Sequence, residues 1–128
     1  MNPRTHLGIS PRWVGACRSL APGHATAALV TLPEMAADER GLVHGGFVFG
    51  LADYAAMLAV DDPNVVLGSA DVRFVAPVRV GDEVVAEARV TATDNRKRTV
   101  AVSAKVGDTE VLTGTLTAFV LDRHVLDR

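Results

Sequence analysis

The second half of the chain alternates apolar and polar residues with a period of two. The alternation runs through 83–93, 99–106 and 110–121, and turn-forming residues separate these stretches at 94–97 and 107–108. Because successive side chains of a strand point to opposite faces of a sheet, this period and the many valines and threonines predict half-buried antiparallel strands. We expect three further strands, the first two from weaker patterns: 13–20, 24–32 and 65–75.

One segment, Phe47–Val60, shows no alternation. It is apolar on every face, contains Ala and Leu, and ends at Asp61-Asp62-Pro63. It is long enough for about four helical turns, and a helix that is apolar all round must be buried. We therefore predict an α+β fold in which a mainly antiparallel sheet of about six strands encloses one helix.

The composition is that of an ordinary globular protein, with 48% apolar and 22% charged residues in a chain of 128. This excludes a disordered tail and a coiled coil, and the length fits a single domain spanning 1–128. The net charge of −2 provides no basic field. We therefore expect neither nucleic acid nor an anionic membrane surface as a partner.

Several absences predict a soluble cytoplasmic protein without a cofactor. The N-terminal residues lack the apolar stretch of a signal peptide, and the longest apolar run, 45–60, is too short to span a bilayer. The single cysteine, Cys17, excludes an internal disulfide and any zinc site built on paired cysteines. Neither metal-like histidine spacing nor a phosphate-loop or dinucleotide motif is found, so we expect no metal.

Asp53 is the only charged residue between Gly45 and Val60. A lone carboxylate in a buried helix destabilises the fold unless it is paired or functional. One interpretation is structural, with the carboxylate at the sheet edge and hydrogen-bonded to a turn. The other is chemical, with apolar surroundings that tune the pKa of a base or a nucleophile.

His44, Gly45 and Gly46 come directly before the predicted helix. The first N–H groups of a helix have no internal partners and lie at the positive end of its dipole, and two glycines leave them uncovered. Such N–H groups could bind an anion or form an oxyanion hole for an acyl group. The simpler alternative is that the two glycines only allow a tight turn into the helix.

The spacing of His44 and Asp53 limits how they can cooperate. At about 1.5 Å rise per residue, nine positions place them roughly 13 Å apart along a helix axis. They cannot form a hydrogen bond within one chain. Either they are unrelated or they meet across a subunit interface, and the second option predicts a two-fold dimer with two composite sites.

The densest positive cluster is Arg96, Lys97 and Arg98, in a predicted hairpin turn. Such a tip is usually only a solvated turn. The alternative is an electrostatic contact with a phosphorylated ligand. Arg73 and Arg79 are weaker candidates for the same role.

The segment from Gly41 to Asp53, GLVHGGFVFGLAD, resembles the hotdog-fold acyl-CoA thioesterases, above all those of the phenylacetic-acid-degradation type. In that group HGG is followed, seven positions after the second glycine, by an acidic residue. The segment 72–82 resembles the family's strand, proline and turn, so that the resemblance covers a core of about 11–121. It implies a curved antiparallel sheet of five to six strands around one long helix, and homodimers that often pair as dimers of dimers.

The resemblance also implies catalytic roles. Asp53 would act as general base on water or attack the thioester itself. The N–H of Gly45, with that of Gly46, would polarise the thioester carbonyl, and His44 would position the thioester or the turn. The opposing subunit would supply Asp53 to the His44 turn.

Two positions depart from the family pattern. Relatives often have Asn six residues before the histidine, where this chain has Asp38, and Asn donates hydrogen bonds that an ionised Asp does not. Relatives also often have Ser or Thr in the strand after the helix. That position falls near Leu67, and we expect Ser69 to substitute for it. Asp71 adds a carboxylate to the same strand, which would raise one pKa if it faced Asp53.

The leading hypothesis is therefore an acyl-CoA thioesterase that releases a carboxylate and free CoA. One alternative is a non-catalytic acyl-CoA-binding module, because some hotdog domains sense acyl-CoA and regulate transcription; retention of Asp53 favours hydrolysis. A hydratase or dehydratase is a third hypothesis, although its residue spacing does not match. Five apolar helix residues could shape an acyl pocket or belong to the core: Phe47, Phe49, Leu51, Tyr54 and Met57.

Overall fold

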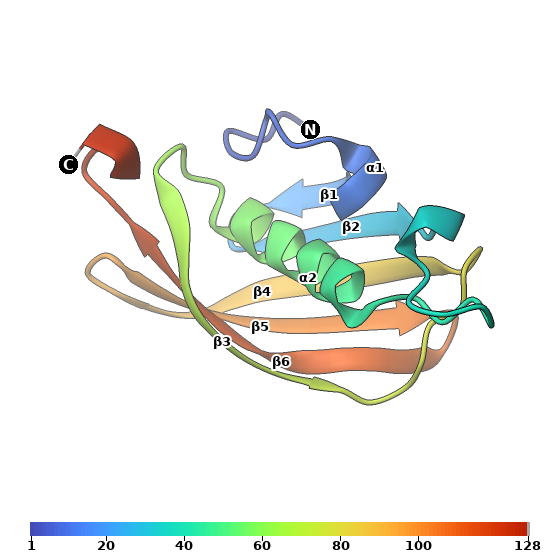
Figure 1. Cartoon of the computed structure of the whole chain (residues 1–128). Helices are drawn as coiled ribbons and strands as arrows, with labels where there is room; N and C mark the ends of the chain where they lie inside the picture. Colours follow the sequence, from blue (N-terminus) through green and yellow to red (C-terminus); the bar gives the residue numbers. More distant parts are fainter. Residues whose placement is uncertain (128) are drawn as a thin grey trace.

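Residues 1–127, which the computed structural model describes, form one curved antiparallel sheet with a long helix on its concave side (Figure 1). The six strands follow the order β1-β2-β4-β5-β6-β3. They are β1 (Ala16–Ala21), β2 (His24–Val30), β3 (Val65–Phe74), β4 (Glu83–Asp94), β5 (Lys97–Val106) and β6 (Thr109–Val120). The helices are α1 (Pro11–Val14) and α2 (Gly45–Val60), with 3₁₀ turns at Pro33–Met35 and Val125–Asp127.

The strands of the second half and the α+β class are confirmed. β3, β4, β5 and β6 each begin and end within two residues of the predicted stretches. The alternation also identified the inner face of the sheet. In β4, Val84, Ala86 and Ala88 are buried, whereas Glu87 and Arg89 are exposed.

The first predicted strand begins later than expected. Trp13 lies in the short helix α1 rather than in β1. The Oγ of Ser10 caps that helix by accepting from the N–H of Arg12, and proline suits the first helical position that follows. Gly15 then ends α1 at φ 90°, where a Cβ would stand 2.6 Å from the carbonyl oxygen of Ala28. Capping therefore overrides the weak strand pattern at this point.

Helix α2 supplies the centre of the core, as its apolar sequence predicted. The helix is capped at its C-terminus by Asp61, which has a left-handed φ of 52°. The N–H of Asp61 donates to the Met57 carbonyl at 2.8 Å. Leu51 and Leu58 have no exposed surface. They pack on a sheet face made of small apolar side chains, so truncating either leucine costs about 2–5 kcal/mol.

β3 forms an edge of the sheet and pairs only with β6 among the described residues. A bulge at Gly68 shifts its register, and a Cβ there would stand 2.5 Å from the Phe119 ring. Opposite β3, a Cβ on Gly114 would stand 2.2 Å from the carbonyl oxygen of Asp71, so the two strands need that glycine. The outer backbone groups of β3 remain available for pairing with another strand.

No helix within residues 1–127 is long and apolar enough to cross a membrane.

Candidate functional site

The N-terminus of α2 is built around the His44 backbone. His44 is the residue before the helix, and its N–H donates to the Met35 carbonyl at 2.8 Å. Its own carbonyl accepts the N–H of Phe47 at 3.0 Å. The N–H groups of Gly45 and Gly46 precede this bond and belong to the unpaired first turn of the helix. They form a small donor site at the positive end of the helix dipole.

Two aromatic side chains lie close to these glycines. A Cβ on Gly46 would stand 3.0 Å from Cδ2 and 3.1 Å from Nε2 of His44. A Cβ on Gly45 would stand 3.2 Å from Cε1 of Phe74, at the end of β3. The missing side chains therefore let one imidazole and one phenyl ring approach the donor site from two sides. The His44 ring is exposed and stands edge-on to Phe47.

Asp53 lies on α2 at the ninth helical position, and its Oδ1 is buried without a hydrogen-bond partner among the described residues. Removal from water raises the pKa of the Asp53 carboxyl, and the charge of His6 opposes this effect by lowering it. The structural interpretation of Asp53 required a hydrogen bond to a turn, and Oδ1 has none. A partly buried carboxylate without a partner is the kind of group that the chemical interpretation requires.

The regular helix keeps the carboxylate and the donor site apart. α2 runs unbroken from Gly45 to Val60, so His44 and Asp53 are separated by roughly 13 Å along its axis. This separation agrees with the expectation that the two do not meet within one chain.

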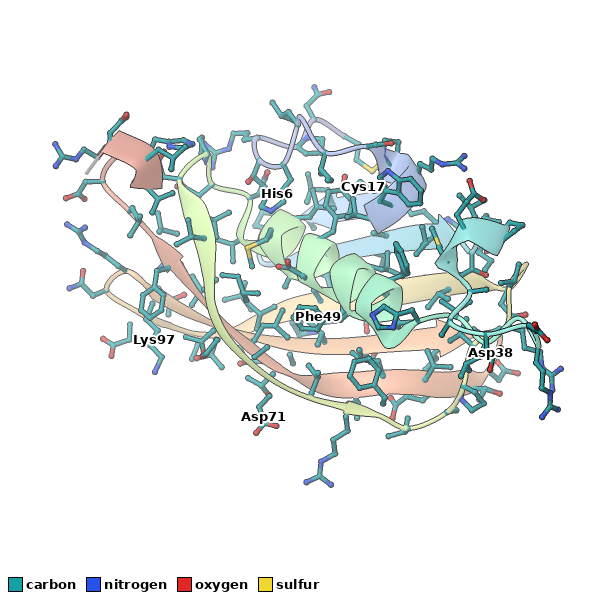
Figure 2. The ribbon with its side chains drawn as sticks, viewed as in Figure 1. His6, Cys17, Asp38, Phe49, Asp71 and Lys97 are labelled. Atoms are coloured by element: carbon teal, nitrogen blue, oxygen red, sulfur yellow. The ribbon has the colours of Figure 1, made fainter. Side chains whose placement is uncertain are left out.

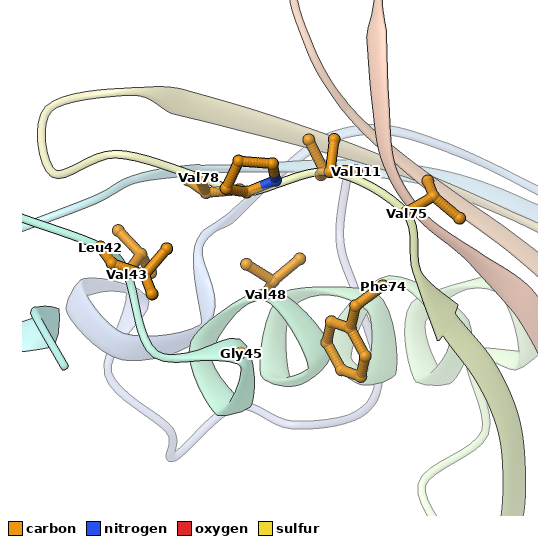
Figure 3. A pocket seen from close by; sticks show the side chains of 10 residues that line it. Leu42, Val43, Gly45, Val48, Phe74, Val75, Val78 and Val111 are labelled. Carbon is orange, nitrogen blue, oxygen red and sulfur yellow. The ribbon is translucent and has the colours of Figure 1, made fainter.

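An apolar cavity of about 380 Å³ opens beside Gly45 (Figure 3). Its wall comes from the loop before α2, from Val48 on the first turn, and from the end of β3 with the loop after it. Phe74 and Val75 of this wall are half exposed. The remaining lining residues are Leu42, Val43, Ala76, Pro77, Val78 and Val111.

Comparison with known proteins identifies the family. Residues 40–113, more than half of the chain, match the family model described as the thioesterase superfamily. The chain belongs to the thioesterase superfamily. The matched region contains all of α2, the three strands β3, β4 and β5, and the start of β6, so His44, Gly45, Gly46 and Asp53 lie inside it.

Solved structures of other proteins share this fold. An uncharacterised protein of Pyrococcus horikoshii is 49% identical, with a TM-score of 0.96 over 99% of this chain and 100% of that chain. A mutant of the phenylacetic acid degradation protein PaaI from Thermus thermophilus is 32% identical, with a TM-score of 0.76 over 84% of this chain and 95% of that chain. The hotdog fold implied by the sequence is thereby confirmed.

The chain spans less than half of the curated relatives that it matches first. It is 47% identical over 123 residues to a methylthioribose-1-phosphate isomerase of Aquifex aeolicus, which is 95% of this chain and 27% of that protein. It is 32% identical over 87 residues to the transcription factor FapR of a Thermoanaerobacter species, covering 68% of this chain and 44% of that protein. Both longer proteins thus contain a stretch similar to this superfamily member.

Asp38 organises the loop that leads to the donor site. Its Oδ1 accepts the N–H of Arg40 at 2.9 Å and the N–H of Leu42 at 3.2 Å. The loop then crosses to Arg79 through an isolated bridge at Leu42. In this thioesterase-superfamily chain the Asp38 carboxylate is therefore occupied by backbone donors, which an ionised Asp can accept.

The structure does not bring Ser69 to Asp53. Ser69 pairs with Thr117, whose neighbour Leu116 is buried on the inner face, so Ser69 lies on the outer face. Asp71, two residues on, shares that face and points away from the helix (Figure 2). The side chain of β3 that packs against the core near the family's polar position is Leu67.

The three cations at the hairpin tip lie at the end of the molecule opposite to the donor site (Figures 1 and 2). The Arg96 guanidinium forms an ion pair with Asp122. Arg98 Nη1 donates to the carbonyl of Asn95 at 2.7 Å and to that of Lys97 at 3.3 Å. Within one protomer these cations therefore do not approach the Gly45 turn.

A different pair of arginines lies closer to the cavity. Arg40 and Arg79 line a hollow that shares Leu42 and Pro77 with the apolar cavity. Arg79 was predicted only as a weak candidate from the sequence, and Arg40 was not predicted. Their proximity depends on the loop held by Asp38, which no local pattern predicts.

No sequence pattern predicted that the N-terminal residues lie beside α2. His6 is the residue whose charge acts on Asp53. The only available signal was the presence of a histidine in a segment without strand or helix pattern. Within residues 1–127 no group of three or more histidine, cysteine, aspartate or glutamate residues is arranged to hold a metal ion.

Proposed function

We propose that this chain is an acyl-CoA thioester hydrolase whose catalytic carboxylate is Asp53. The observation that carries the proposal is the buried and unpartnered Oδ1 of Asp53 on a helix whose first N–H groups are open. A carboxylate kept in an apolar setting without a structural partner retains the basicity that proton abstraction needs. Membership of the thioesterase superfamily and the 32% identity to a phenylacetic acid degradation protein support this assignment.

The donor site performs the electrophilic part of the reaction. The thioester carbonyl oxygen binds at the N–H of Gly45, with the N–H of Gly46 beside it. As the carbonyl carbon is attacked, negative charge moves to this oxygen, and the fixed N–H donors and the helix dipole stabilise it. His44, whose ring folds over the Gly46 backbone, positions the thioester at this turn.

The Asp53 carboxylate performs the nucleophilic part by one of two routes. As general base it accepts a proton from water, and the resulting hydroxide attacks the carbonyl carbon. As nucleophile it forms an anhydride with the acyl group, which water then hydrolyses. In both routes the carbon–sulfur bond breaks, the CoA thiolate leaves and takes up a proton, and a carboxylic acid is released.

The two parts belong to different subunits. Since α2 separates His44 from Asp53 by roughly 13 Å, one complete site needs the Asp53 of one protomer and the turn of its partner. The unpaired edge of β3 offers the contact for a two-fold dimer with a continuous sheet. Each dimer then has two composite sites, and pairs of dimers form the larger assembly.

The cavity beside Gly45 takes the acyl group. It is lined by aliphatic side chains and the Phe74 ring, so it favours an apolar acyl chain or an aryl group over a charged one. Cationic side chains bind phosphates well, and two groups of basic residues are candidates for binding the CoA phosphates. They are the cluster Arg96, Lys97 and Arg98 of the partner, and the pair Arg40 and Arg79 beside the cavity.

Free-thiol release from short, long, branched and aryl acyl-CoA esters tests the proposal, with Asp53→Asn as the comparison. We expect turnover of at least one ester and a loss of more than about 100-fold in Asp53→Asn, because a general acid–base group contributes about that much. Asp71→Asn is the matched control, since Asp71 points away from the helix, and it should keep full activity. Equal turnover by Asp53→Asn and the unmodified chain would contradict the assignment.

A second candidate is a non-catalytic acyl-CoA-binding module. The identity to the transcription factor FapR favours it, because a stretch similar to this chain occurs there in a regulator. The same ester panel separates the two functions. A binding module would give a calorimetric binding signal with acyl-CoA and no thiol release by any variant.

A further inference from the structure

The outer face of the sheet, on the side away from α2, has two adjacent rows of side chains with charged residues at their ends. Residues opposite each other on paired strands share a face, so a row can be followed across β4, β5, β6 and β3. The first row consists of Arg89, Ala101, Thr115 and Asp71. The second row, two residues along each strand, consists of Glu87, Ser103, Thr113 and Arg73. The four charged residues are exposed, and Figure 2 shows Asp71 pointing away from the helix.

The signs of the charges are reversed between the two rows. The first row has its positive charge on β4 and its negative charge on β3, whereas the second row has the opposite arrangement. Among the described residues, Arg89, Asp71 and Arg73 form no ion pair. A hydrogen bond with His24 at 2.8 Å lowers the pKa of the Glu87 carboxyl. The four charges cancel, so these rows do not favour a polyanion but a surface whose charges also alternate.

The middle of this face is made of small uncharged side chains. They lie on β5 and β6 and are Ala101, Ser103, Thr113 and Thr115. They leave a hollow of about 260 Å³ beside Glu87 and Arg89. The face is the convex side of the curved sheet (Figure 1), so two such faces approach most closely in the middle and diverge at the flanks. Small side chains in the middle and long charged side chains at the flanks suit this shape.

The pattern of charges is complementary to itself. A second copy of the chain can be turned by 180° about an axis that lies across the strands, midway between the two rows. Each row then faces the other row of the copy, strand by strand. Arg89 faces the partner's Glu87, Asp71 faces the partner's Arg73, and the two-fold symmetry repeats each contact. Every charge of the two rows therefore meets its opposite.

The orientation of this axis also decides whether the assembly closes. An axis along the strands, between β5 and β6, would match the same charges, but it would not cross the two-fold axis of a contact at the β3 edge. Such a combination gives an open array. The axis across the strands runs to the β3 edge near Val72, between Asp71 and Arg73, where the two axes can cross. The two contacts then close into a tetramer.

We propose that the outer face of the sheet binds the same face of a second copy, through Arg89 and Glu87 of β4 and Asp71 and Arg73 of β3. This contact is distinct from the edge contact, which uses backbone groups of β3. The choice of axis rests on the edge contact of the proposed function, whereas the pattern of charges does not. Asp53 and the donor site lie with α2 on the other side of the sheet, so the contact leaves them open.

Native mass spectrometry of the full chain at low micromolar concentration tests the proposal by exchanging charges on β4. Arg89→Glu sets a like charge against the partner's Glu87 twice in each contact. We expect the Kd of this contact to rise more than about 100-fold, because like charges that face each other across an interface repel. The double variant with Arg89→Glu and Glu87→Arg exchanges both signs, so opposite charges face each other again and the assembly should recover. Arg123→Glu makes the same charge change at an exposed residue of the C-terminal tail and should leave the assembly unchanged.

We expect a tetramer for the unmodified chain and for the double variant, and a dimer for Arg89→Glu. If the edge contact of the proposed function is absent, the same series gives a dimer, a dimer and a monomer, so the two contacts are judged separately. Ala101→Lys puts a long side chain in the middle of the face and should also halve the mass, and circular dichroism verifies that each variant is folded. An unchanged mass of Arg89→Glu, or a double variant that stays dissociated, overturns the proposal.

Discussion

At the residue scale, Asp53 is a carboxylate whose ionised form is poorly stabilised by the fold. Its Oδ1 has no hydrogen-bond partner among the described residues, and desolvation raises the pKa of its carboxyl. A group whose pKa is raised by folding binds its proton more tightly in the folded state. The protein is therefore destabilised whenever Asp53 is ionised, and this penalty is accepted where a base is needed.

This property predicts a pH-dependent difference in stability between the unmodified chain and Asp53→Asn. Above the folded pKa the ionised carboxylate destabilises the fold, so Asp53→Asn should have the higher Tm at pH 7. As pH falls below about 4, the unfolded carboxyl also becomes protonated and the advantage of the variant should disappear. Thermal unfolding followed by circular dichroism between pH 3.5 and 8 measures the difference.

The control for this measurement is Asp71→Asn. Asp71 is an exposed carboxylate on the outer face of β3, so its substitution should give no stabilisation that grows with pH. The quantity to compare is the Tm of Asp53→Asn minus the Tm of the unmodified chain. If this difference were smaller at pH 7 than at pH 4, Asp53 would have a stabilising partner in the assembled protein.

Local signals made some site residues predictable from the sequence and left others hidden. Asp53 is the one charge in an apolar helix, and Gly45 and Gly46 are adjacent glycines at its start. These three residues could therefore be predicted from their immediate neighbours in the sequence. His6 could not, because its position beside the helix depends on the contacts of Arg4 and Thr5 rather than on any periodicity.

At the element scale, β3 depends on the absence of a side chain in β6. A Cβ on Gly114 would lie 2.2 Å from the Asp71 carbonyl oxygen and 2.7 Å from Cα of Val72. Both atoms are backbone, so neither can move aside without shifting the strand. The edge that is available for dimer pairing is thus held in register by one glycine.

We therefore predict that Gly114→Ala destabilises the fold by about 1–3 kcal/mol, the usual effect of forcing a methyl group into a packed interior. Chemical denaturation of the variant measures this change. Gly8→Ala is the control, because nothing lies within 4 Å of a Cβ at Gly8, and it should change stability by less than about 0.5 kcal/mol. Equal stability of both variants would show that β3 and β6 are not packed this closely.

The elements were largely predictable because hydrophobic periodicity carries most of their information. The strands of the second half follow the alternation of inner and outer residues, and α2 follows from its uniform apolarity. Trp13 was wrongly predicted to lie in a strand, since a serine cap and a proline form a short helix there. The apolar cavity was not predicted, because its wall combines the start of α2 with residues near 74–78 and 111.

At the scale of the whole molecule, the proposed composite site divides each protomer into two half-sites. The donor site at Gly45 and the carboxylate of Asp53 lie on one rigid helix that keeps them apart. Apolar residues also remain exposed beside β3, since Phe74 is 55% and Val75 is 50% exposed. Exposed apolar surface next to an unpaired strand edge is typical of a surface that another chain covers. A dimer through this edge would bury the apolar surface and complete both sites.

Mixing two inactive variants tests the composite thioesterase site most directly. Asp53→Asn and His44→Ala are each expected to lack turnover alone, whereas a mixed dimer has one site with both intact groups. After subunit exchange, verified by mass spectrometry of the intact dimers, thiol release should recover to about a quarter of the unmodified activity, because half of the dimers are mixed and each has one intact site. Verified mixed dimers that remain inactive would contradict catalysis shared between Asp53 of one subunit and the His44 turn of its partner.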